Sequence, residues 1–476
     1  MTHSLGHKAV SGAIWASINR FGSMSMQFVV NIILARLLLP ADFGMIGMLT
    51  IFIAISQTLI DGGFGSALIQ KKNPTQKDYS TIFFWNLFFS GILYLILFLC
   101  APLIAEFYSM PNLSSVLRVL ALSLILSGIV SIQKVRLQKE LAFKIIAVVD
   151  LVSYALTALI AIYLADRGLG AWSLVIMQLA YIVLSIIMLS FITHWKPSLY
   201  FSKTSLKELF GFGGFIMAAN ILQTVCSNVQ GLIIGKRFSA TQMGYFSQAY
   251  KLDLVTSYSI PQVIVQVMYP IYSSIQDDKA RLNSIVLMNM RVIAFIVFPI
   301  LSILILSAEP LITLLYGEKW LPSVPYFRIL CVGGFFVCLQ NLNYYAVAAV
   351  GKSKSLFKWS FYKWGFLLAA LLIGMNFGMY GILWGMVLSN LNIFLTNAFL
   401  SSKHTGLTLL NQILAILPLL LISLIIIGSG IIMQSLDFSA IMTCTISLLL
   451  YFGISYIVQL RATQETISVI LRLIHH

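Results

Sequence analysis

The chain has 476 residues, of which 59% are hydrophobic and 9% are charged, and its mean hydropathy is +0.94. Soluble globular proteins carry about 25% charged residues, so this composition excludes a water-exposed globular fold and indicates an all-α polytopic membrane protein. The formal net charge of +15 comes mostly from short loops between apolar runs, where topology and contact with anionic lipids account for it. We therefore expect no nucleic-acid binding.

Fourteen apolar runs are long enough to cross a bilayer as helices. They lie at about 9–35, 42–66, 79–102, 112–133, 144–165, 171–193, 209–235, 241–268, 287–308, 323–347, 357–377, 379–400, 411–432 and 438–460. We therefore predict about 14 transmembrane helices.

The loops between these runs alternate in charge. One set holds fourteen cations, namely Lys71, Lys72, Lys77, Lys134, Arg136, Lys139, Lys196, Lys203, Lys207, Lys279, Arg281, Lys352, Lys354 and Lys403. The other set holds five, namely Arg36, Arg167, Lys236, Arg237 and Lys319. Because positive loops tend to stay inside, we expect the first set and both termini to lie in the cytoplasm.

The first six runs recur about 200 residues later in the chain. The matched positions include Ile33 with Ile233, Arg36 with Lys236, Asp42 with Gln242, Gly44 with Gly244, Arg20 with Asn220, Arg118 with Arg328 and Gly170 with Gly381. Two units with an even number of spans insert in the same orientation, so the repeats are predicted to be parallel, around a central cavity.

This repeat predicts four parts of the chain. They are an N-terminal six-helix bundle (1–195), a cytoplasmic linker (196–208), a C-terminal six-helix bundle (209–402), and two extra transmembrane helices with a tail (403–476). In the linker, Ser205 and Glu208 have the spacing of a capping box that would open the seventh helix. The two extra helices are either a lipid-facing addition or a site for a lipid tail or partner.

Three charged residues are predicted near the bilayer midplane, namely Arg20, Lys251 and Asp253. A charge at this depth is retained where it faces a cavity or a partner. For Arg20 we expect contact with an anionic substrate, and the alternative is a structural pair with a carboxylate such as Asp253. Lys251 and Asp253 are two residues apart and so point in different directions on a helix.

Further polar residues are candidates for the same cavity. Asn31 and Gln27 in the first helix, with Asn220 and Asn228 in the seventh, supply substrate-binding amides. Arg118 and Arg328 either line the outer vestibule or extend to the headgroups. Asp61 precedes Gly62 and Gly63 and is a candidate for gating or ion coupling together with Asp253, and the favoured alternative for Asp61 is a simple helix end.

The sequence offers no catalytic or metal site. The five cysteines fall in predicted spans without metal-ligand spacing, and the six histidines lie near termini or interfaces. We expect no cofactor and no enzymatic activity. Without an ATPase motif, conformational change must draw on an ion gradient, the membrane potential or the substrate gradient.

Three segments carry a family resemblance. Ser11–Trp15 reads SGAIW, Ile33–Gly44 reads ILARLLLPADFG, and Asp61–Gln70 reads DGGFGSALIQ. They resemble polysaccharide (Wzx-type) flippases of the MOP superfamily, in particular the branch of colanic and teichuronic acid exporters. The resemblance extends over the doubled six-helix plan and the two extra helices.

The resemblance implies a flippase that moves an undecaprenyl-diphosphate-linked oligosaccharide from the inner to the outer leaflet of the bacterial plasma (inner) membrane. It implies a role in surface polysaccharide or O-antigen-type lipopolysaccharide export, with alternating access through a cationic cavity. Arg20 is the best match to a cavity cation, followed by Lys251. Possible partners are a coupling ion (H⁺ or Na⁺) and polysaccharide polymerase machinery.

Two other functions compete with this prediction. A MATE-type drug or cation antiporter would have twelve spans and carboxylates in its cavity, whereas this chain predicts fourteen spans and a net positive centre. A membrane polymerase or ligase would need long outer loops with catalytic residues, and the predicted outer loops are short.

Overall fold

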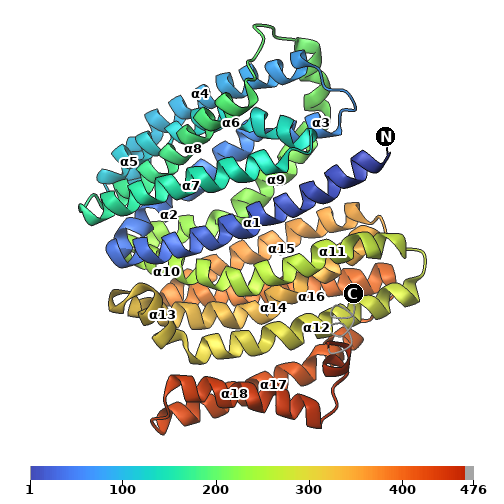
Figure 1. The fold of residues 1–476 in the computed structure, drawn as a ribbon. Helices are drawn as coiled ribbons and strands as arrows, with labels where there is room; N and C mark the ends of the chain where they lie inside the picture. Colours follow the sequence, from blue (N-terminus) through green and yellow to red (C-terminus); the bar gives the residue numbers. More distant parts are fainter. Residues whose placement is uncertain (1, 467–476) are drawn as a thin grey trace. The chain divides into compact units, whose positions relative to one another are not determined.

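A computed structural model describes residues 2–466. This part of the chain is helical without β-strands, and it forms two compact units, Met1–Gly244 (unit 1) and Tyr245–His476 (unit 2) (Figure 1). The all-α membrane architecture predicted from the composition is therefore confirmed.

Unit 1 consists of nine long or medium helices and the start of a tenth. They are α1 (Thr2–Leu37), α2 (Pro40–Asp61), α3 (Phe64–Gln70), α4 (Gln76–Phe107), α5 (Asn112–Leu120), α6 (Leu122–Lys139), α7 (Phe143–Asp166), α8 (Ala171–Thr193), α9 (Lys203–Arg237) and the first residues of α10 (Ala240–Leu254).

Unit 2 continues from α10 through a π-helical turn, η1 (Val255–Ser259), into α11 (Ile260–Ser274). The remaining elements are α12 (Lys279–Leu306), α13 (Ala308–Tyr316), η2 (Glu318–Ser323), α14 (Val324–Ala349), α15 (Ser353–Gly374), η3 (Met375–Phe377), α16 (Gly378–Thr405), α17 (Leu409–Ser435) and α18 (Ala440–Ile457). Helix α14 packs against α11, α12 and α16, and α17 packs against α12 and α18.

Ten helical stretches of the described chain are long and apolar enough to cross a membrane, and one of them, Ser353–Thr405, contains both α15 and α16. The long helices α1, α9 and α10–α11 are not among the ten. They carry many of the polar residues that we predicted to serve the substrate path. The structure is thus consistent with the fourteen predicted spans.

The start of the seventh predicted span differs from our prediction. Ser202, not Ser205, caps α9, because its side chain accepts a hydrogen bond from the backbone N–H of Ser205 at 3.1 Å. Glu208 is therefore not part of a capping box, and the last residues of the predicted linker 196–208 are helical. A serine that precedes a helix by one turn competes with a serine inside it, and sequence spacing alone does not rank the two.

The second predicted span ends in a glycine turn. Gly62 and Gly63 have φ angles of 51° and 70°, which favour glycine, and they separate α2 from α3. A Cβ atom on Gly63 would lie 2.3 Å from the backbone oxygen of Gly213 in α9. The turn and α9 thus approach each other backbone to backbone.

A second close approach lies at the other end of α2. A Cβ atom on Gly44 would lie 1.7 Å from the backbone oxygen of Ala240, and one on Gly244 would lie 1.8 Å from that of Pro40. Between the two glycine contacts, the hydroxyls of Thr58 and Thr224 are 3.0 Å apart. Glycines at both ends therefore let α9 and the start of α10 pack closely along α2.

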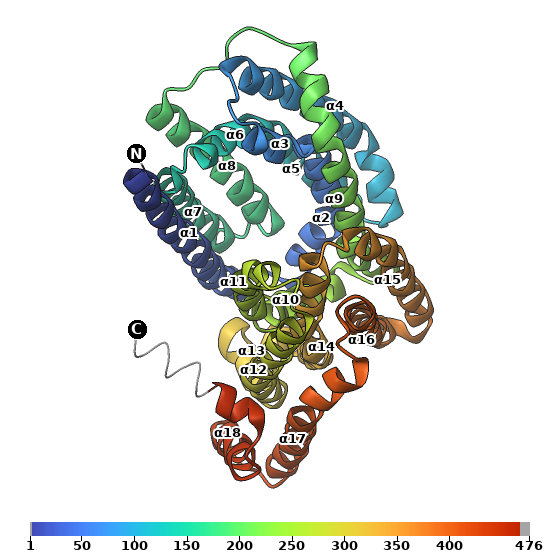
Figure 2. The ribbon, with the colours of Figure 1, turned by 90° about the vertical axis from the view of Figure 1, so that its right-hand side faces the viewer.

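Figure 2 shows α1 beside α7 at one side of unit 1 and α9 beside α2 at the other. Asp42 connects two helices at the end of this unit. One of its carboxylate oxygens accepts from the backbone N–H of Leu39 at 2.9 Å, which helps to cap α2, and the other accepts from that of Ala171 at 2.9 Å, at the start of α8. The Ile33–Gly44 segment thus includes a residue that fixes two helix starts.

The close approach at Gly44 predicts a large effect of a small substitution. Gly44→Ala should lower the free energy of unfolding by about 1–3 kcal/mol, because the added methyl group has no space against the Ala240 backbone. Thermal unfolding of the purified protein in detergent measures this effect. Gly91→Ala in α4 is the control, since its Cβ would meet no atom within 4 Å; equal stability of both variants would contradict the prediction.

Candidate functional site

Helix α1 carries a polar stripe along one face. Arg20, Gln27 and Asn31 follow one another at seven and four residues, which places them on the same side of a helix. Arg20 and Gln27 are exposed and Asn31 is half-buried. The stripe is thus presented to the surroundings of α1 rather than enclosed among the helices that pack on it.

A different side of α1, about 100° around the helix from Arg20, is tied to the rest of unit 1 by a charged cluster. The carboxylate of Asp150 in α7 accepts hydrogen bonds from Lys134 Nζ at 2.6 Å, from Tyr181 Oη at 2.9 Å and from Asn19 Nδ2 at 3.1 Å. These residues come from α6, α8 and α1. Because the side chains of Asp150 and Lys134 are only 13% and 23% exposed, this cluster is an almost internal ion pair that connects four helices.

None of the four residues of this cluster was among the predicted site residues. A weak signal was present, because Lys134 directly follows the fourth predicted span (112–133) and Asp150 lies within the first two turns of the fifth (144–165). Opposite charges near the same loop of two consecutive antiparallel helices can pair. The tyrosine and the asparagine that complete the cluster carry no comparable sequence signal.

Helix α9 presents a second polar face in unit 1. Asn220, Gln223 and Ser227 are exposed, and the Gln223 amide donates to the Ser227 hydroxyl at 3.0 Å. The predicted substrate contact Asn228 is half-buried and donates to the backbone oxygen of Thr224 at 2.8 Å. Of the two predicted amides in α9, Asn220 is therefore the more accessible one.

Arg118 in α5 and Arg328 in α14, which match in the sequence repeat, make equivalent contacts within their own units. Arg118 Nε donates to the backbone oxygen of Phe98 at 3.3 Å, and Arg328 Nε donates to that of Ile305 at 3.2 Å. Each guanidinium thus binds a carbonyl of the preceding span. Arg118 also lies 4.5 Å from the ring centre of Phe98.

In unit 2, Lys251 and Asp253 point in different directions. Lys251 is exposed, whereas Asp253 is 5% exposed and accepts a hydrogen bond from the hydroxyl of Ser257 at 2.5 Å. Ser257 lies in the π-helical turn η1, and a Cβ atom on Gly334 of α14 would lie 2.2 Å from its oxygen. π-Helical turns inside α-helices often occur at functional sites, and this one places a hydroxyl on a buried carboxylate.

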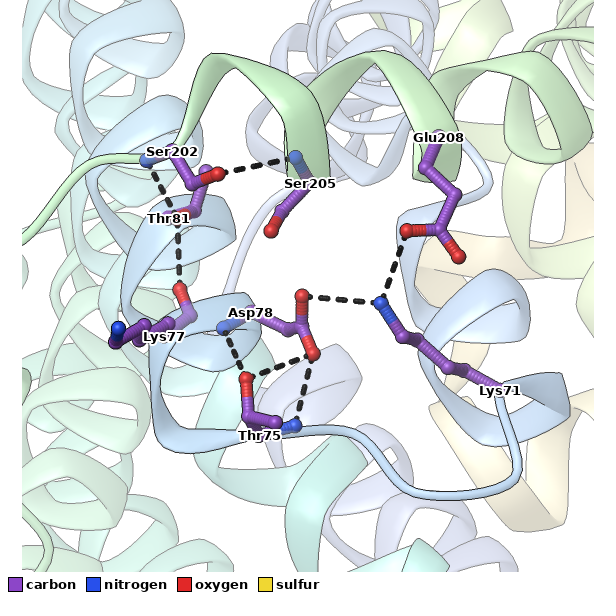
Figure 3. A network of polar contacts seen from close by, with 8 residues as sticks. All are labelled: Lys71, Thr75, Lys77, Asp78, Thr81, Ser202, Ser205 and Glu208. Carbon is purple, nitrogen blue, oxygen red and sulfur yellow. Dashed lines mark hydrogen bonds and ion pairs between the residues drawn. The ribbon is translucent and has the colours of Figure 1, made fainter.

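A polar network joins the start of α9 to the segment between α3 and α4 (Figure 3). Lys71 Nζ lies 3.2 Å from the carboxylate of Asp78 and 3.1 Å from that of Glu208. Asp78 also accepts from the backbone N–H of Thr75 at 2.8 Å and from its hydroxyl at 2.9 Å. Lys71 therefore connects a buried carboxylate of α4, 4% exposed, with a carboxylate of α9 that is 61% exposed.

The same region holds further contacts. Thr81 accepts from the backbone N–H of Ser202 at 3.1 Å, and Lys139 Nζ donates to the backbone oxygen of Lys71 at 2.7 Å. The pKa of Lys71 is subject to opposing effects: burial alone would lower it, but the bonds to Glu208 and Asp78 outweigh burial and raise it above the ordinary 10.5. Asp61, which we predicted at a gate, is exposed at the end of α2, next to the glycine turn.

An apolar hollow of about 490 Å³ lies on unit 1. Its lining comes from one face of α4 and from the linker before α9, and consists of Phe84, Trp85, Leu87, Phe88 and Phe201. Such a lining suits a hydrocarbon chain and offers no polar group to a sugar or phosphate. Within residues 2–466 we find no group of three His, Cys, Asp or Glu residues arranged to hold a metal ion.

Comparison with known proteins gives a consistent result. A family model described as "Polysaccharide biosynthesis protein" matches residues 33–325. The teichuronic acid biosynthesis protein TuaB of Bacillus subtilis is 25% identical over 368 residues, which cover 75% of this chain and 74% of TuaB. The lipopolysaccharide biosynthesis protein WzxC of Escherichia coli is 25% identical over 381 residues, which cover 78% and 76%.

Among solved structures, the lipid II flippase MurJ in an inward closed conformation is similar, with a TM-score of 0.73. The match covers 93% of this chain and 98% of MurJ at 15% sequence identity. At this identity the similarity establishes the fold.

The two partners of Lys71 should contribute unequally to stability. Asp78→Asn should lower the free energy of unfolding by about 1–3 kcal/mol, since it weakens a buried, multiply bonded carboxylate, whereas Glu208→Gln should cost below about 1 kcal/mol. Thermal unfolding in detergent compares them, with the exposed Lys72→Met as control. A larger loss for Glu208→Gln than for Asp78→Asn would contradict this prediction.

Because the pKa of Lys71 is raised on folding, the stabilising effect of its ion pairs should be complete below pH 10.5 and be lost as the pH rises through the raised pKa.

The Asp150 cluster should show strong coupling between its charges. Lys134→Met should cost about 3 kcal/mol, because it leaves a carboxylate without its counter-ion. The double variant Lys134→Met/Asp150→Asn should cost less than the sum of the single changes in a thermal-unfolding cycle. Arg136→Met, which removes an exposed pair with Glu140 at the end of α6, should have an effect below about 1 kcal/mol. Additive effects at Lys134 and Asp150 would argue against an internal pair.

Proposed function

Because this chain belongs to the polysaccharide biosynthesis protein family, we propose that it is a flippase that moves a lipid-linked oligosaccharide diphosphate from the inner to the outer leaflet of a bacterial plasma membrane. The names of its relatives support this substrate class, since TuaB and WzxC take part in teichuronic acid and lipopolysaccharide biosynthesis. The fold that it shares with the lipid II flippase MurJ supports the same function. A transporter, and not an enzyme, is the consistent assignment.

The observation that carries the proposal is the exposed polar stripe of α1, with Arg20 as its cation. A MATE-type cation antiporter would present carboxylates to its substrate. In the described part of the chain, Asp150 is bound by Lys134 and Asp253 is buried against Ser257. Arg20 on α1 and Lys251 on α10 are exposed cations, and they suit an anionic substrate.

The substrate has three chemically distinct parts, and different residues suit each of them. A guanidinium such as that of Arg20 makes paired, charge-assisted hydrogen bonds with a diphosphate, and Lys251 supplies a second cation. The amides of Gln27, Asn31, Asn220 and Asn228 match sugar hydroxyls. Arg118 and Arg328 would guide the anion near the outer ends of their helices. The lipid tail stays in apolar surroundings, of which the hollow on α4 is one example.

Alternating access of two six-helix bundles, 1–195 and 209–402, would carry the diphosphate across. At the glycine turn beside Asp61 and the π-helical turn beside Asp253 a helix can change direction, so we assign gating or coupling to H⁺ or Na⁺ to these two carboxylates. Both termini lie in the cytoplasm in this proposal. Anionic lipids contact the cationic loops, and a polysaccharide polymerase is a candidate partner.

Arg20 provides the direct test of this function. Arg20→Ala should slow transport of a fluorescent lipid-linked oligosaccharide diphosphate into the outer-leaflet position of proteoliposomes by about tenfold or more, because it removes a charge-assisted contact worth about 1.5–3 kcal/mol. Arg20→Lys should retain part of the rate, since it keeps the charge and loses the paired geometry.

Arg167→Ala is the matched control, because Arg167 is an exposed arginine in a predicted outer loop. Its guanidinium lies 5.2 Å from the ring centre of Tyr163. It should transport at the normal rate. If wild-type protein does not move the lipid, the proposed function is wrong. If Arg20→Ala moves it normally, Arg20 has no part in the mechanism.

A further inference from the structure

The apolar hollow of unit 1 is formed by one face of α4 and by the α8–α9 segment, residues 194–202. Phe84 and Phe88 are four residues apart and lie on the same face of α4. Phe201 of the α8–α9 segment lines the hollow from outside that helix. With a volume of about 490 Å³, the hollow is in the size range of ligand sites. It therefore has room for part of a ligand, which an evenly packed helix surface does not offer.

Hydrogen bonds hold the α8–α9 segment in place beside α4. The backbone N–H of Ser198 donates to the hydroxyl of Ser80 at 2.9 Å, and that of Ser202 donates to the hydroxyl of Thr81 at 3.1 Å (Figure 3). Both hydroxyls belong to the second turn of α4. Because one bond precedes Phe201 by three residues and the other follows it directly, this wall of the hollow is a fixed part of the fold.

Three consecutive residues of the α8–α9 segment are apolar or aromatic and yet exposed. Leu199 is 96% exposed, Tyr200 is 48% exposed and Phe201 is 44% exposed. Lys196 and Lys203, both exposed, flank them. Water is an unfavourable surrounding for such apolar side chains, and apolar and aromatic residues near lysines are typical of the membrane interface. We therefore expect this segment to lie at the headgroup region of a bilayer.

A cation lies on the same face of α4 as the hollow. Lys77 is exposed in the first turn of α4, and Phe84 and Phe88 follow it at seven and eleven residues. The phenylalanines therefore lie about 10 Å and about 16 Å farther along the helix axis. Because α4 is long and apolar enough to cross a membrane and a headgroup layer is only about 5–8 Å deep, Lys77 lies among the headgroups when the phenylalanines lie in hydrocarbon. Lys77 Nζ also lies 4.8 Å from the ring centre of Tyr200.

The neighbouring carboxylates do not offset the charge of Lys77. Asp78 is 4% exposed and pairs with Lys71, and Glu208 pairs with the same lysine. The exposed lysines of this region thus leave a positive charge at the level of the headgroups. A molecule that complements this surface has a negative headgroup and a hydrocarbon chain that enters the hollow.

Two kinds of membrane lipid combine a phosphate with a hydrocarbon chain. In a polyprenyl diphosphate the phosphate is bonded directly to the chain, whereas in a phospholipid the glycerol and ester groups lie between the two. The axial separation of about 10 Å between Lys77 and Phe84 leaves room for these groups. The spacing therefore favours a phospholipid, although the hydrocarbon of either lipid suits the lining.

We propose that the hollow binds an acyl chain of one phospholipid whose anionic headgroup lies at Lys77. The phosphate accepts a charge-assisted hydrogen bond from the ammonium, and the chain packs against Phe84, Phe88 and Phe201. The alternation of loop charge predicts that this end of α4 faces the cytoplasm, where the membrane surface is negative. Because the α8–α9 segment joins the two predicted six-helix bundles, the bound lipid stabilises the start of that connection.

Quenching of tryptophan fluorescence by brominated lipids tests this site in the full chain. The protein is placed in phosphatidylcholine nanodiscs that contain a small fraction of a lipid brominated in its acyl chains. The difference between wild type and Trp85→Phe isolates the signal of Trp85, which lines the hollow. Half-quenching of this signal should require about fivefold less brominated phosphatidylglycerol than brominated phosphatidylcholine, which is the effect of one lysine on an anionic headgroup. Equal amounts would indicate contact with bulk lipid only and would overturn the proposal.

Substitutions separate the headgroup contact from general effects of charge. Lys77→Gln should remove most of the preference for phosphatidylglycerol, and Lys77→Arg should keep it. Lys72→Gln is the matched control, because Lys72 is an exposed lysine that precedes α4, and it should behave like the wild type. Phe201→Ser should also lose the preference, whereas Phe191→Ser, which changes an exposed aromatic residue of α8, should not. A wild-type preference in Lys77→Gln or in Phe201→Ser would overturn the proposal.

A polyprenyl diphosphate is the competing occupant of the hollow. Added to the nanodiscs in the same amount as brominated phosphatidylglycerol, it should leave the quenching of Trp85 unchanged. If it restores the fluorescence, the hollow belongs to the proposed lipid-linked substrate and the assignment to a phospholipid is wrong. These measurements require no transport. A failure of the lipid site therefore stays distinguishable from a failure of the flippase function, which is measured in proteoliposomes.

Discussion

The bilayer's intolerance of unsatisfied charge is the constraint on which the rest of this structure depends. In a medium of low dielectric constant, an ionised group needs a counter-ion, a set of hydrogen bonds or access to water. The chain uses each solution in turn. Lys134 and Asp150 neutralise one another, Asp253 is hydrogen-bonded by Ser257, and Arg20 faces outward from its helix. The distribution of these solutions separates groups that hold the fold together from groups that lie on exposed helix faces.

Much of the fold follows from the sequence because the signal is repeated in every span. Long apolar runs predict the membrane helices: the predicted ends coincide with those of α8 (Ala171–Thr193), and they differ by up to eight residues for longer helices such as α12 (Lys279–Leu306). The family resemblance in the first 70 residues agrees with the matching family model and the relatives. Polar residues in α1 and their common face are also predictable, since helical periodicity alone determines which of them share a side.

The remaining features depend on contacts between distant residues. The role of Glu208 as a partner of Lys71 requires the start of α9 to lie near the α3–α4 segment, and local capping rules favour a different assignment. The cluster around Asp150 draws on four helices, so its members are recognised only when their neighbours are known. Likewise, the need for glycine at position 44 arises from the Ala240 backbone and not from its own helix.

The unequal exposure of the two carboxylates on Lys71 has a mechanical consequence. Asp78 is enclosed and stays with the lysine, while Glu208 projects into water. Should the start of α9 swing away, the lysine would remain neutralised by Asp78, and water would solvate the departing glutamate. Breaking the Lys71–Glu208 contact would thus leave no unpaired ion in an apolar environment, so this contact can open and re-form at low energetic cost.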